Sequence, residues 1–297
     1  MKHTTEQDYR SRVLKVLQHI GNHLDTPLSL ETLAVIANFS PYHFHRIFRG
    51  LVGETLGDYI RRQRLEHAAR SLRRGEPVLT TALDSGYESP ESFSRAFKTF
   101  YGVSPTEYIG LTPAPEPKVT RSNMPLGPDG LLLILPPSIR SLNMNVDITT
   151  LKDIPIAFIR HTGAYTEIGP VFERIVGWAV TNGHMRDDTM TLGRYYDDPQ
   201  SVTVDQLRSD ACITVPEDSK TEKDIERGIV PGGLYAKAQF KGPYTGLQNA
   251  YNFLYGTWMP SSGREAANAP SMEIYINSPW DTPPEKLLTE IYIPLKS

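Results

Sequence analysis

The sequence contains little that could form covalent cross-links or insert into a membrane. Its 297 residues include one cysteine, Cys212, so neither an intrachain disulfide nor a cysteine-based zinc cluster can form. A chain without disulfides suits a reducing compartment. The longest apolar run, Leu131 to Leu135, is far too short to span a bilayer, and the polar start MKHTTEQDYRSR is unlike a signal peptide. We therefore expect a cytoplasmic protein that does not contact a membrane.

Recognisable catalytic and metal-binding patterns are also scarce. There is no Gly-rich phosphate loop of the Walker type and no nucleophile elbow. His19 and His23 have the i, i+4 spacing that could hold a metal on a helix, but no third ligand accompanies them. His161 and Cys212 both fall on expected strands, where structural roles suit them better than catalysis. We expect no metal, no cofactor and no catalytic residue.

The formal net charge is only −3, which by itself argues against a nucleic-acid partner. The charge is unevenly divided, however. Residues 1–112 hold 14 Lys/Arg and 12 Asp/Glu, whereas the remainder holds 17 and 22. This asymmetry predicts different partners for the two halves, and the position of the basic residues decides which.

The N-terminal half contains a duplication with a constant offset of 49 residues. The repeated residues are Ser40, Pro41, Phe44, Arg46, Phe48, Gly53, Tyr59 and Ile60, which recur as Ser89, Pro90, Phe93, Arg95, Phe97, Gly102, Tyr108 and Ile109. In each copy a short helix, 30–37 or 78–85, leads to a turn at Asn38 or Gly86. A serine N-cap and a proline then begin a second helix. This order predicts two helix-turn-helix units.

The second helix of each unit has an apolar face and a polar face. The polar faces consist of Tyr42, His45, Arg46 and Arg49 in the first copy, and of Glu91, Ser94, Arg95 and Lys98 in the second. Solvent exposure alone would explain them, but this is the helix that a helix-turn-helix places in the major groove. Arg46 and Arg95 can each donate two hydrogen bonds to guanine, and Glu91 can accept one from cytosine. We expect Tyr42, His43 and His45 to serve the same DNA face.

Phosphate contacts and the link between the units complete this prediction. Arg49, Lys98 and the exposed N–H groups at Ser40 and Ser89 would hold phosphates. A long helix from Asp58 to Arg74 should fix the separation of the two recognition helices. One monomer could then fill two successive major-groove segments of double-stranded DNA, about 34 Å apart, or bend the DNA where the spacing does not match.

The stretches SLETLAVIANFSPYHFHRIFRGLVGETLGDYIRRQRL and ALDSGYESPESFSRAFKTFYGVSPTEYI resemble the DNA-binding domain of the AraC/XylS family of transcription regulators. The resemblance covers about residues 10 to 110. It implies base contacts by Tyr42, His45 and Arg46 in the first unit, and by Glu91, Ser92 and Arg95 in the second. Many relatives have Trp or Arg at the position of Tyr42, so the operator sequence does not transfer.

Seven prolines between Thr112 and Pro137 predict a semi-rigid linker over 113–143, in which LLLIL (131–135) forms a short strand. A second duplication follows, with an offset of 79 residues: Gly163, Tyr165, Thr166 and Phe172 recur as Gly242, Tyr244, Thr245 and Tyr251. Each copy has a strand, helix, strand, strand pattern. The expected elements are 154–162, 167–181, 190–196 and 209–215, then 233–241, 246–259, 271–277 and 288–295. They predict an α+β domain with a pseudo-two-fold axis and a ligand groove between the copies.

Two of these strands suggest the kind of ligand. Met272, Ile274 and Ile276 alternate with Glu273, Tyr275 and Asn277, and Ile291 and Ile293 alternate with Glu290 and Tyr292. We expect the aliphatic face to pack on the helices and the other face to carry both carboxylates. Together with nearby aromatic rings they would suit an organic cation. The expected ligand-binding residues are Glu273, Tyr275, Glu290, Tyr292, Tyr165, Trp178, Tyr195, Tyr244 and Trp258. A sheet face open to water is the alternative.

The motifs VDITTLKDIPIAFIRHTGAYTEI, GGLYAKAQFKGPYTGL, MEIYINSP and LTEIYIPL resemble GyrI-like effector-binding domains. The resemblance implies a lipophilic cation in an aromatic pocket around a central glutamate, here Glu273 with Glu290 as second candidate. The order of domains resembles that of Rob-like regulators.

The expected architecture is multidomain. An all-α double helix-turn-helix domain (1–112) is followed by the linker (113–143) and an α+β GyrI-like domain of two strand-helix-strand-strand repeats (144–297). We expect a small-molecule effector to control DNA affinity or contact with RNA polymerase in a chain that could act as a monomer. Two alternatives remain for the C-terminal domain. One is a hydrolase of strained electrophiles, which would use Glu273 with Tyr275 or Tyr165. The other is a protein-binding module.

Overall fold

The computed structural model describes residues 5–118, 144–222 and 224–297, and the chain forms two compact units. Of the described residues, unit 1 comprises 5–6, 39–47, 144–222 and 224–297, and unit 2 comprises 7–38 and 48–118. The expected strand at residues 131–135 lies outside the described residues.

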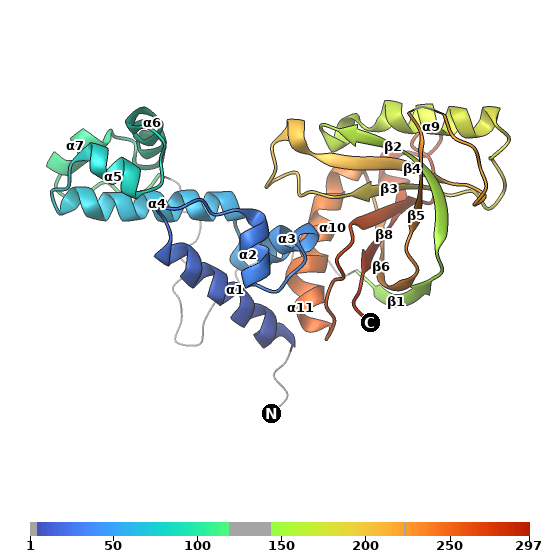
Figure 1. Cartoon of the computed structure of the whole chain (residues 1–297), viewed down its shortest axis with the longest axis horizontal. Coiled ribbons are helices and arrows are strands. Elements are labelled where there is room, and N and C mark those ends of the chain that lie inside the picture. Colours follow the sequence, from blue (N-terminus) through green and yellow to red (C-terminus); the bar gives the residue numbers. More distant parts are fainter. Residues whose placement is uncertain (1–4, 119–143, 223) are drawn as a thin grey trace. The chain divides into compact units, whose positions relative to one another are not determined.

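Seven helices are described before residue 119, and their order is shown in Figure 1. They are α1 (Thr5–Asn22), α2 (Leu30–Ile36), α3 (Pro41–Val52), α4 (Leu56–Arg73), α5 (Val78–Asp84), α6 (Pro90–Tyr101) and α7 (Pro105–Gly110). Helices α2 and α3 form the first predicted helix-turn-helix, and α5 and α6 form the second. Helix α4 is the predicted connecting helix. Helix α1 contains His19, where the sequence also indicated a helix, and α7 adds to the predicted set.

The turns of both units have the predicted backbone conformation. Asn38 adopts φ 52° and Gly86 adopts φ 71°, so both turns use the left-handed region that these residue types tolerate. Ser89 caps α6, because its side chain accepts a hydrogen bond from the N–H of Ser92. Ser40 differs: its carbonyl accepts from the N–H of Phe44 at 2.9 Å, while its hydroxyl donates to Oδ1 of Asn268 at 2.8 Å. The Ser40 hydroxyl is thus engaged as a donor, and a capping role for its lone pairs stays a prediction.

Unit 2 is held together by the apolar faces that the sequence predicts. Phe93, Phe97 and Phe100 of α6 are buried in one cluster with Leu65 and Leu72 of α4. The rings of Phe93 and Phe97 lie 5.5 Å apart between centroids. Burial of side chains of this size contributes roughly 1.5–3 kcal/mol each.

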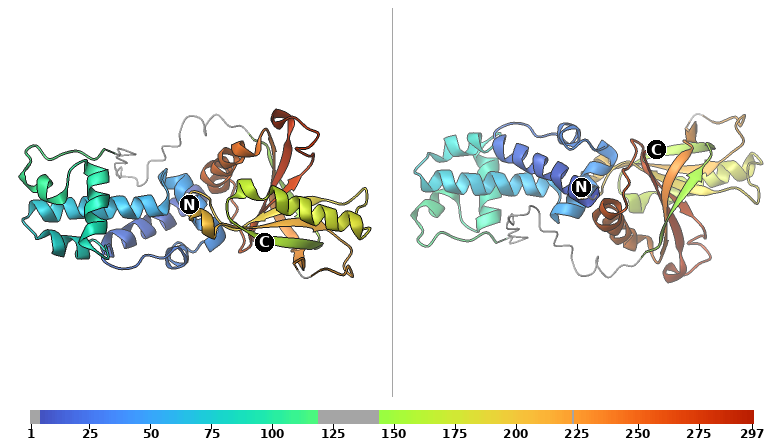
Figure 2. Two further views of the ribbon diagram at one scale, coloured as in Figure 1. Left: turned by 90° about the horizontal axis from the view of Figure 1, so that it is seen from above. Right: turned by 90° about the horizontal axis from the view of Figure 1, so that it is seen from below.

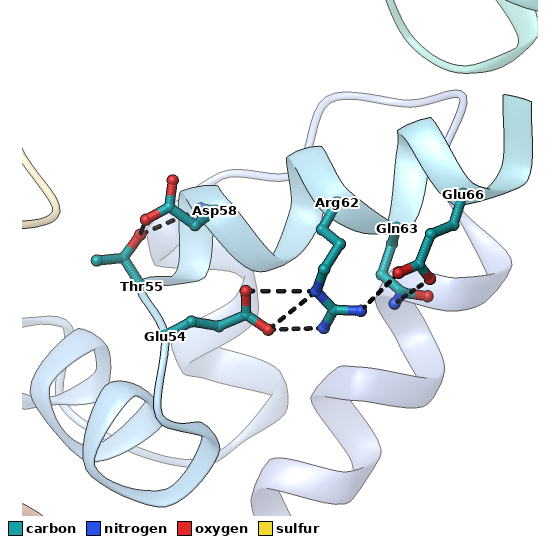
Figure 3. Close-up of polar contacts among 6 residues, drawn as sticks. All are labelled: Glu54, Thr55, Asp58, Arg62, Gln63 and Glu66. Carbon is teal, nitrogen blue, oxygen red and sulfur yellow. Dashed lines mark hydrogen bonds and ion pairs between the residues drawn. The ribbon is translucent and has the colours of Figure 1, made fainter. Parts of the chain in front are cut away.

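Arg62 of α4 links two acidic side chains (Figure 3). Its Nη2 lies 2.6 Å from Oε1 of Glu54, and its Nη1 lies 3.0 Å from Oε1 of Glu66. Thr55 caps the same helix by accepting from the N–H of Asp58 at 3.1 Å. The Arg62 side chain thus ties the residue before the N-cap to the middle of α4.

The C-terminal half is an eight-stranded antiparallel sheet with helices, as expected of an α+β domain. Its strands are β1 (Val146–Leu151), β2 (Ile154–Thr162), β3 (Thr191–Tyr195), β4 (Arg208–Thr214), β5 (Glu226–Val230), β6 (Gly233–Lys241), β7 (Ser271–Tyr275) and β8 (Leu288–Pro294). Its main helices are α9 (Gly169–Thr181), α10 (Leu247–Phe253) and α11 (Met259–Ser261), with a π-helical stretch over Leu254–Trp258 between the last two.

The strand order β1-β6-β8-β7-β3-β4-β2-β5 reads symmetrically from its centre. Strands β3 and β7 occupy equivalent places in the two copies and pair with each other, so the pseudo-two-fold axis passes between them. The predicted repeat lacked the outer strands. Strand β1 precedes the first copy but pairs with β6 of the second, and β5 precedes the second copy but pairs with β2 of the first.

The exchange of outer strands requires the sheet to curl. Strands β5 and β6 lie near opposite edges, yet only Pro231 and Gly232 separate them in the chain. Lys152 and Asp153 likewise connect β1 to β2. The two connections touch, since the N–H of Gly232 donates to Oδ1 of Asp153 at 2.6 Å. The curled sheet encloses an apolar cluster on one face, containing Phe158, Leu192, Cys212, Met272, Ile274 and Tyr292 among others.

The helices cover the other face of the sheet (Figure 2). Register assigns residues to faces, because directly paired residues of antiparallel strands point to the same side. Gly193 pairs with both Ala211 and Glu273. Ala211 packs with Ile175 and Trp178 of α9, so Glu273 also lies on the helix-covered side.

Candidate functional site

The candidate effector site is built around Glu273, which lies on β7 next to the pseudo-two-fold axis and is only 4% exposed. Tyr251 of α10 donates a hydrogen bond to Oε1 at 2.9 Å, and Tyr275 donates one to Oε2 at 3.1 Å. Helix α10 and strand β7 therefore place their side chains around one carboxylate.

Gly193 explains why only one of the two copies places a carboxylate at this point of the sheet. It stands directly opposite Glu273 on β3, at the equivalent place of the first copy. A Cβ atom at this glycine would lie 2.6 Å from the ring of Tyr195, which fills the space that a side chain would need. The symmetry of the fold thus gives way at its centre, where the second copy contributes an acid and the first a glycine.

Aromatic side chains surround Glu273 from both copies. The hydroxyls of Tyr195 and Tyr275 lie 2.5 Å apart, and the rings of Tyr165 and Tyr195 meet edge to face at 4.8 Å. Rings of Tyr244 and Phe172 lie 5.5 Å and 5.4 Å from that of Tyr275. With Tyr251 and Tyr255, which stack at 6.3 Å, these residues form what we call the Glu273 cluster. Its members are Glu273, Phe172, Tyr165, Tyr195, Tyr244, Tyr251, Tyr255 and Tyr275.

Burial controls the protonation of this cluster. It raises the pKa of Glu273 to about 7, although the hydrogen bonds from Tyr251 and Tyr275 and the charge of Arg46 act to lower it. Burial also raises the pKa of Tyr195, Tyr251 and Tyr275 well above the usual value. The tyrosines therefore remain neutral donors, while the glutamate exchanges its proton near neutral pH.

A guanidinium lies on the aromatic side of the cluster. Within unit 1, Arg46 of α3 is 6% exposed, and its Cζ lies 4.6 Å from the ring centroid of Tyr251 and 5.8 Å from that of Tyr255. Its Nη2 donates to the carbonyl of Asp197 at 2.9 Å, and its Nη1 donates to Oγ of Ser271 at 3.3 Å. The cluster accommodates a planar organic cation in this arrangement.

The neighbours of Arg46 on α3 are buried as well. His43 is fully enclosed, with its Nδ1 at 2.7 Å from the hydroxyl of Tyr255. Burial, Arg46 and His45 lower the pKa of His43 to about 3. Burial and Arg46 lower that of His45 to about 4, against the opposing charges of Asp198 and Asp197. Both imidazoles are therefore neutral at physiological pH.

The other predicted DNA contacts are more accessible. Glu91, Arg95 and Lys98 of α6 are exposed, and Ser89, Ser92 and Ser94 are half-buried. Ser40, Tyr42 and Arg49 are half-buried on or next to α3. The polar face of the second recognition helix is thus open to solvent, whereas His43, His45 and Arg46 of the first are enclosed within unit 1.

The structure does not bring all predicted ligand residues together. Tyr165, Tyr195, Tyr244, Glu273 and Tyr275 belong to the cluster. Glu290 and Tyr292 lie on the opposite face of the sheet, since Glu290 pairs with Ile274 and Tyr292 with Met272. There Glu290 binds Nζ of Lys237 at 2.6 Å and accepts from the hydroxyl of Tyr292 at 2.8 Å.

The prediction that both carboxylates share a face was therefore wrong. Glu273 pairs with Ile291, so the aliphatic residues of β7 and those of β8 point to opposite sides. The prediction that the Met272 face packs on the helices was also wrong, because the curl of the sheet encloses that face.

The predicted tryptophans occupy other positions. Trp178 of α9 is 3% exposed, packs in the core with Ala211 of the sheet, and has its ring 4.9 Å from that of His184. Trp258 is half-buried in the π-helical stretch. Sequence reasoning had not assigned Tyr251 and Tyr255 to the site. Tyr251 carried a signal, because it matches Phe172 in the C-terminal repeat, whereas no pattern in the sequence indicated Tyr255.

The sequence offered two further candidates, the histidine pair at positions 19 and 23 and the lone cysteine. His19 and His23 stack at 4.1 Å, and no group of three or more metal-ligating side chains occurs among residues 5–118, 144–222 and 224–297. Cys212 is buried, as expected. Over the same described ranges, no helix combines the length and apolarity needed for crossing a bilayer.

Comparison with known proteins supports this division of the chain. A model described as a helix-turn-helix domain matches residues 33–110, and one described as a GyrI-like small molecule binding domain matches residues 144–296. Transcriptional regulator Rob of Salmonella typhimurium is 25% identical over 304 residues, covering 97% of this chain and 99% of that protein. Regulatory protein SoxS of Escherichia coli K12 is 40% identical over 90 residues, covering 30% of this chain and 84% of that protein.

Among solved structures, the EcmrR C-terminal domain matches 52% of this chain and 99% of its own, with 20% identity and a TM-score of 0.45. The GyrI-like model matches more than half of the chain, so the chain belongs to the GyrI-like family. It is a DNA-binding transcription regulator that joins an AraC-type helix-turn-helix region to a GyrI-like small-molecule binding domain. The fold class and the family resemblances predicted from the sequence are confirmed.

Proposed function

We propose that the chain reads a specific DNA sequence and that a lipophilic organic cation bound at the Glu273 cluster controls this activity. One observation carries the ligand class. The Glu273 carboxylate is 4% exposed and accepts hydrogen bonds from two tyrosine hydroxyls. The guanidinium of Arg46 stacks on the ring of one of them, Tyr251. The bound effector would change DNA affinity or contact with RNA polymerase.

Burial of Glu273 favours a cationic ligand. An ionised carboxylate removed from water is stabilised when a cation neutralises it and hydrogen bonds satisfy its oxygens. Tyr251 and Tyr275 supply those hydrogen bonds. Aromatic faces attract cations and also remove the apolar body of such a ligand from water. Gly193 opposes Glu273, so only one of the two copies places a carboxylate at the centre of the sheet.

The DNA half of the proposal rests on α6. Arg95 and Glu91 are exposed on the face that a recognition helix presents to base edges, and Lys98 lies one turn further along. Arg95 would pair with guanine O6 and N7, and Lys98 would hold a phosphate. The equivalent residues of α3 would read the neighbouring groove segment.

Calorimetric titration of the full chain with tetraphenylphosphonium and with benzamidinium tests the ligand class. We expect saturable binding by the wild type and a loss of about 1–3 kcal/mol in Glu273→Gln, the range for a hydrogen bond or contact to a charged partner. Glu290→Gln is the matched control, because Glu290 lies on the opposite face. Equal affinity in wild type and Glu273→Gln, or an equal loss in both variants, would contradict the proposal.

A second candidate function, hydrolysis of a strained electrophile, is favoured by the protonation of the same glutamate. A carboxylate whose pKa is about 7 can take a proton from water near neutral pH. Glu273 would take a proton from water as the water oxygen attacks a ring carbon of an epoxide and the C–O bond breaks. The ring oxygen would take a proton from the hydroxyl of Tyr275, and Glu273 would return a proton to that tyrosine, so that the product is the diol. Incubation of the chain with styrene oxide and chromatographic detection of the diol tests this. Product formation that survives Glu273→Gln would argue against it.

A further inference from the structure

The sequence and the structure give Arg46 two roles that exclude each other. Its place on the polar face of α3 predicts a guanine contact in the major groove. In the structure its guanidinium is enclosed within unit 1, stacked on Tyr251 and hydrogen-bonded to Asp197 and Ser271. A guanidinium that is only 6% exposed in this position is inaccessible to a base edge.

The surrounding α3 residues are engaged in the same way. Ser40 donates to Asn268 at 2.8 Å, and His43 contacts the hydroxyl of Tyr255 at 2.7 Å. His45 is 1% exposed. The first turns of α3 therefore contact DNA only after leaving these partners, so the arrangement and DNA binding by this helix exclude each other.

The interactions that hold Arg46 are those expected of an organic cation in the proposed site. They combine stacking of a planar cation on two tyrosine rings with hydrogen bonds to a carbonyl and a hydroxyl. Tyr251 connects them to Glu273, because its ring carries the guanidinium and its hydroxyl binds the carboxylate. A second cation brought to this cluster would compete for the same rings and be repelled by the like charge of Arg46.

We propose that Arg46 is an intramolecular occupant of the effector site, that an organic cation binds to the Glu273 cluster in exchange for it, and that this exchange frees the first recognition helix for DNA. The inference rests on the proposed function, because it assumes that the cluster takes a cation. Thermodynamic linkage then requires reciprocity: the cation strengthens DNA binding by the same factor as DNA strengthens cation binding.

The second helix-turn-helix provides a built-in comparison. Arg95 occupies the equivalent position at the offset of 49 residues, yet it is exposed. The inference therefore assigns gating to the first recognition helix alone. The second remains free to contact DNA in the absence of effector, which would give weak binding that the cation converts to full binding.

Calorimetry with tetraphenylphosphonium on wild type, Arg46→Ala and Arg95→Ala tests the exchange. In the wild type the cation binds only to the fraction of molecules whose site is free of Arg46, which lowers its apparent affinity by that fraction. Arg46→Ala removes this competition, so we expect the cation to bind about tenfold more tightly. Arg95→Ala should match the wild type. Unchanged or weaker binding by Arg46→Ala would overturn the inference.

A cross-linking experiment tests whether the enclosed state of α3 excludes DNA, and it does not depend on cation affinity. Ser40→Cys with Asn268→Cys puts a thiol on each of two residues whose hydroxyl and amide oxygen now lie 2.8 Å apart. We expect oxidation to form the disulfide in the free chain, and a duplex selected from a random pool by the wild type to slow it at least several-fold. The oxidised protein should bind that duplex more weakly than the same protein after reduction.

The outcomes separate the two hypotheses. If neither wild type nor Arg46→Ala binds tetraphenylphosphonium, the proposed cation class fails, and the cross-link still tests the exclusion by DNA. If the disulfide does not form, or if the duplex leaves its rate unchanged, the enclosed state of Arg46 does not compete with DNA and the inference is overturned.

Discussion

Tyr251 and Glu273 are joined by a hydrogen bond of 2.9 Å between two side chains that are 6% and 4% exposed. The same tyrosine ring lies 4.6 Å from Cζ of Arg46. Tyr251 thus binds the Glu273 carboxylate through its hydroxyl and the Arg46 guanidinium through its ring. Removing the hydroxyl oxygen alone should therefore separate the two interactions.

Tyr251→Phe should raise the pKa of Glu273 further while leaving the stacked guanidinium in place. A hydrogen bond to a charged group is worth about 1.5–3 kcal/mol, and one pKa unit corresponds to about 1.4 kcal/mol, so the increase should be about one to two units. Carbon-13 NMR titration of labelled glutamate carboxyls measures it. Tyr292→Phe is the control, because its hydroxyl donates to Glu290 on the other face. The same increase in both variants would contradict the assignment.

Cation binding should release a proton and strengthen as pH rises from 6 to 8. Only the ionised form of Glu273, whose pKa is about 7, neutralises the cation. Arg46 also faces this carboxylate and stays charged over that range, and the surrounding tyrosines stay neutral. The apparent affinity should fall about tenfold per pH unit below the pKa. Titrations in phosphate and Tris buffers will show a buffer-dependent enthalpy in wild type. An equal dependence in Glu273→Gln would contradict the coupling.

The same pKa predicts how stability varies with pH. The folded chain binds more protons at Glu273 than the unfolded chain between the ordinary value of 4.5 and about 7, so this group lowers the free energy of unfolding as pH rises through that interval. The full effect is about 3 kcal/mol by linkage. Urea unfolding at pH 5 and pH 8 should therefore show Glu273→Gln gaining stability relative to wild type at the higher pH. A difference that does not depend on pH would place the pKa elsewhere.

Much of this architecture could be predicted from the sequence because the repeats fix it. The offset of 49 residues locates both helix-turn-helix units, and β2 and β6 have the predicted bounds 154–162 and 233–241. Strands β1 and β5 were not predicted, because each pairs with a strand of the other copy and no local sequence pattern indicates such an exchange. The position of Glu290 was mistaken for the related reason that alternation within a strand does not reveal its register with a neighbour.

The enclosed state of α3 should weaken in mild acid. Arg46 and His45 face His43, and Arg46, Asp198 and Asp197 face His45. Their pKa values of about 3 and 4 lie below the ordinary 6.5, so protonation favours release, and the stabilisation present above pH 6.5 is lost as pH falls. Each imidazole should contribute about 1.4 kcal/mol per pH unit below 6.5. Hydrogen exchange of residues 41–47, corrected for intrinsic rates, should accelerate between pH 7.5 and 5.5. Constant protection would contradict this.

Arg95 and Lys98 should differ in how they affect DNA binding. Arg95→Ala should cost about 1–3 kcal/mol on the selected duplex and relax the preference at one base pair. Lys98→Ala should weaken binding to all sequences alike and reduce the slope of log affinity against log salt by about one. Arg61→Ala is the control, because Arg61 pairs with Asp58 on the exposed surface of α4. Titrations by fluorescence anisotropy at several salt concentrations distinguish these results. Equal losses on every sequence for both variants would show that Arg95 contacts only phosphate, and the second recognition helix would then position the chain without reading bases.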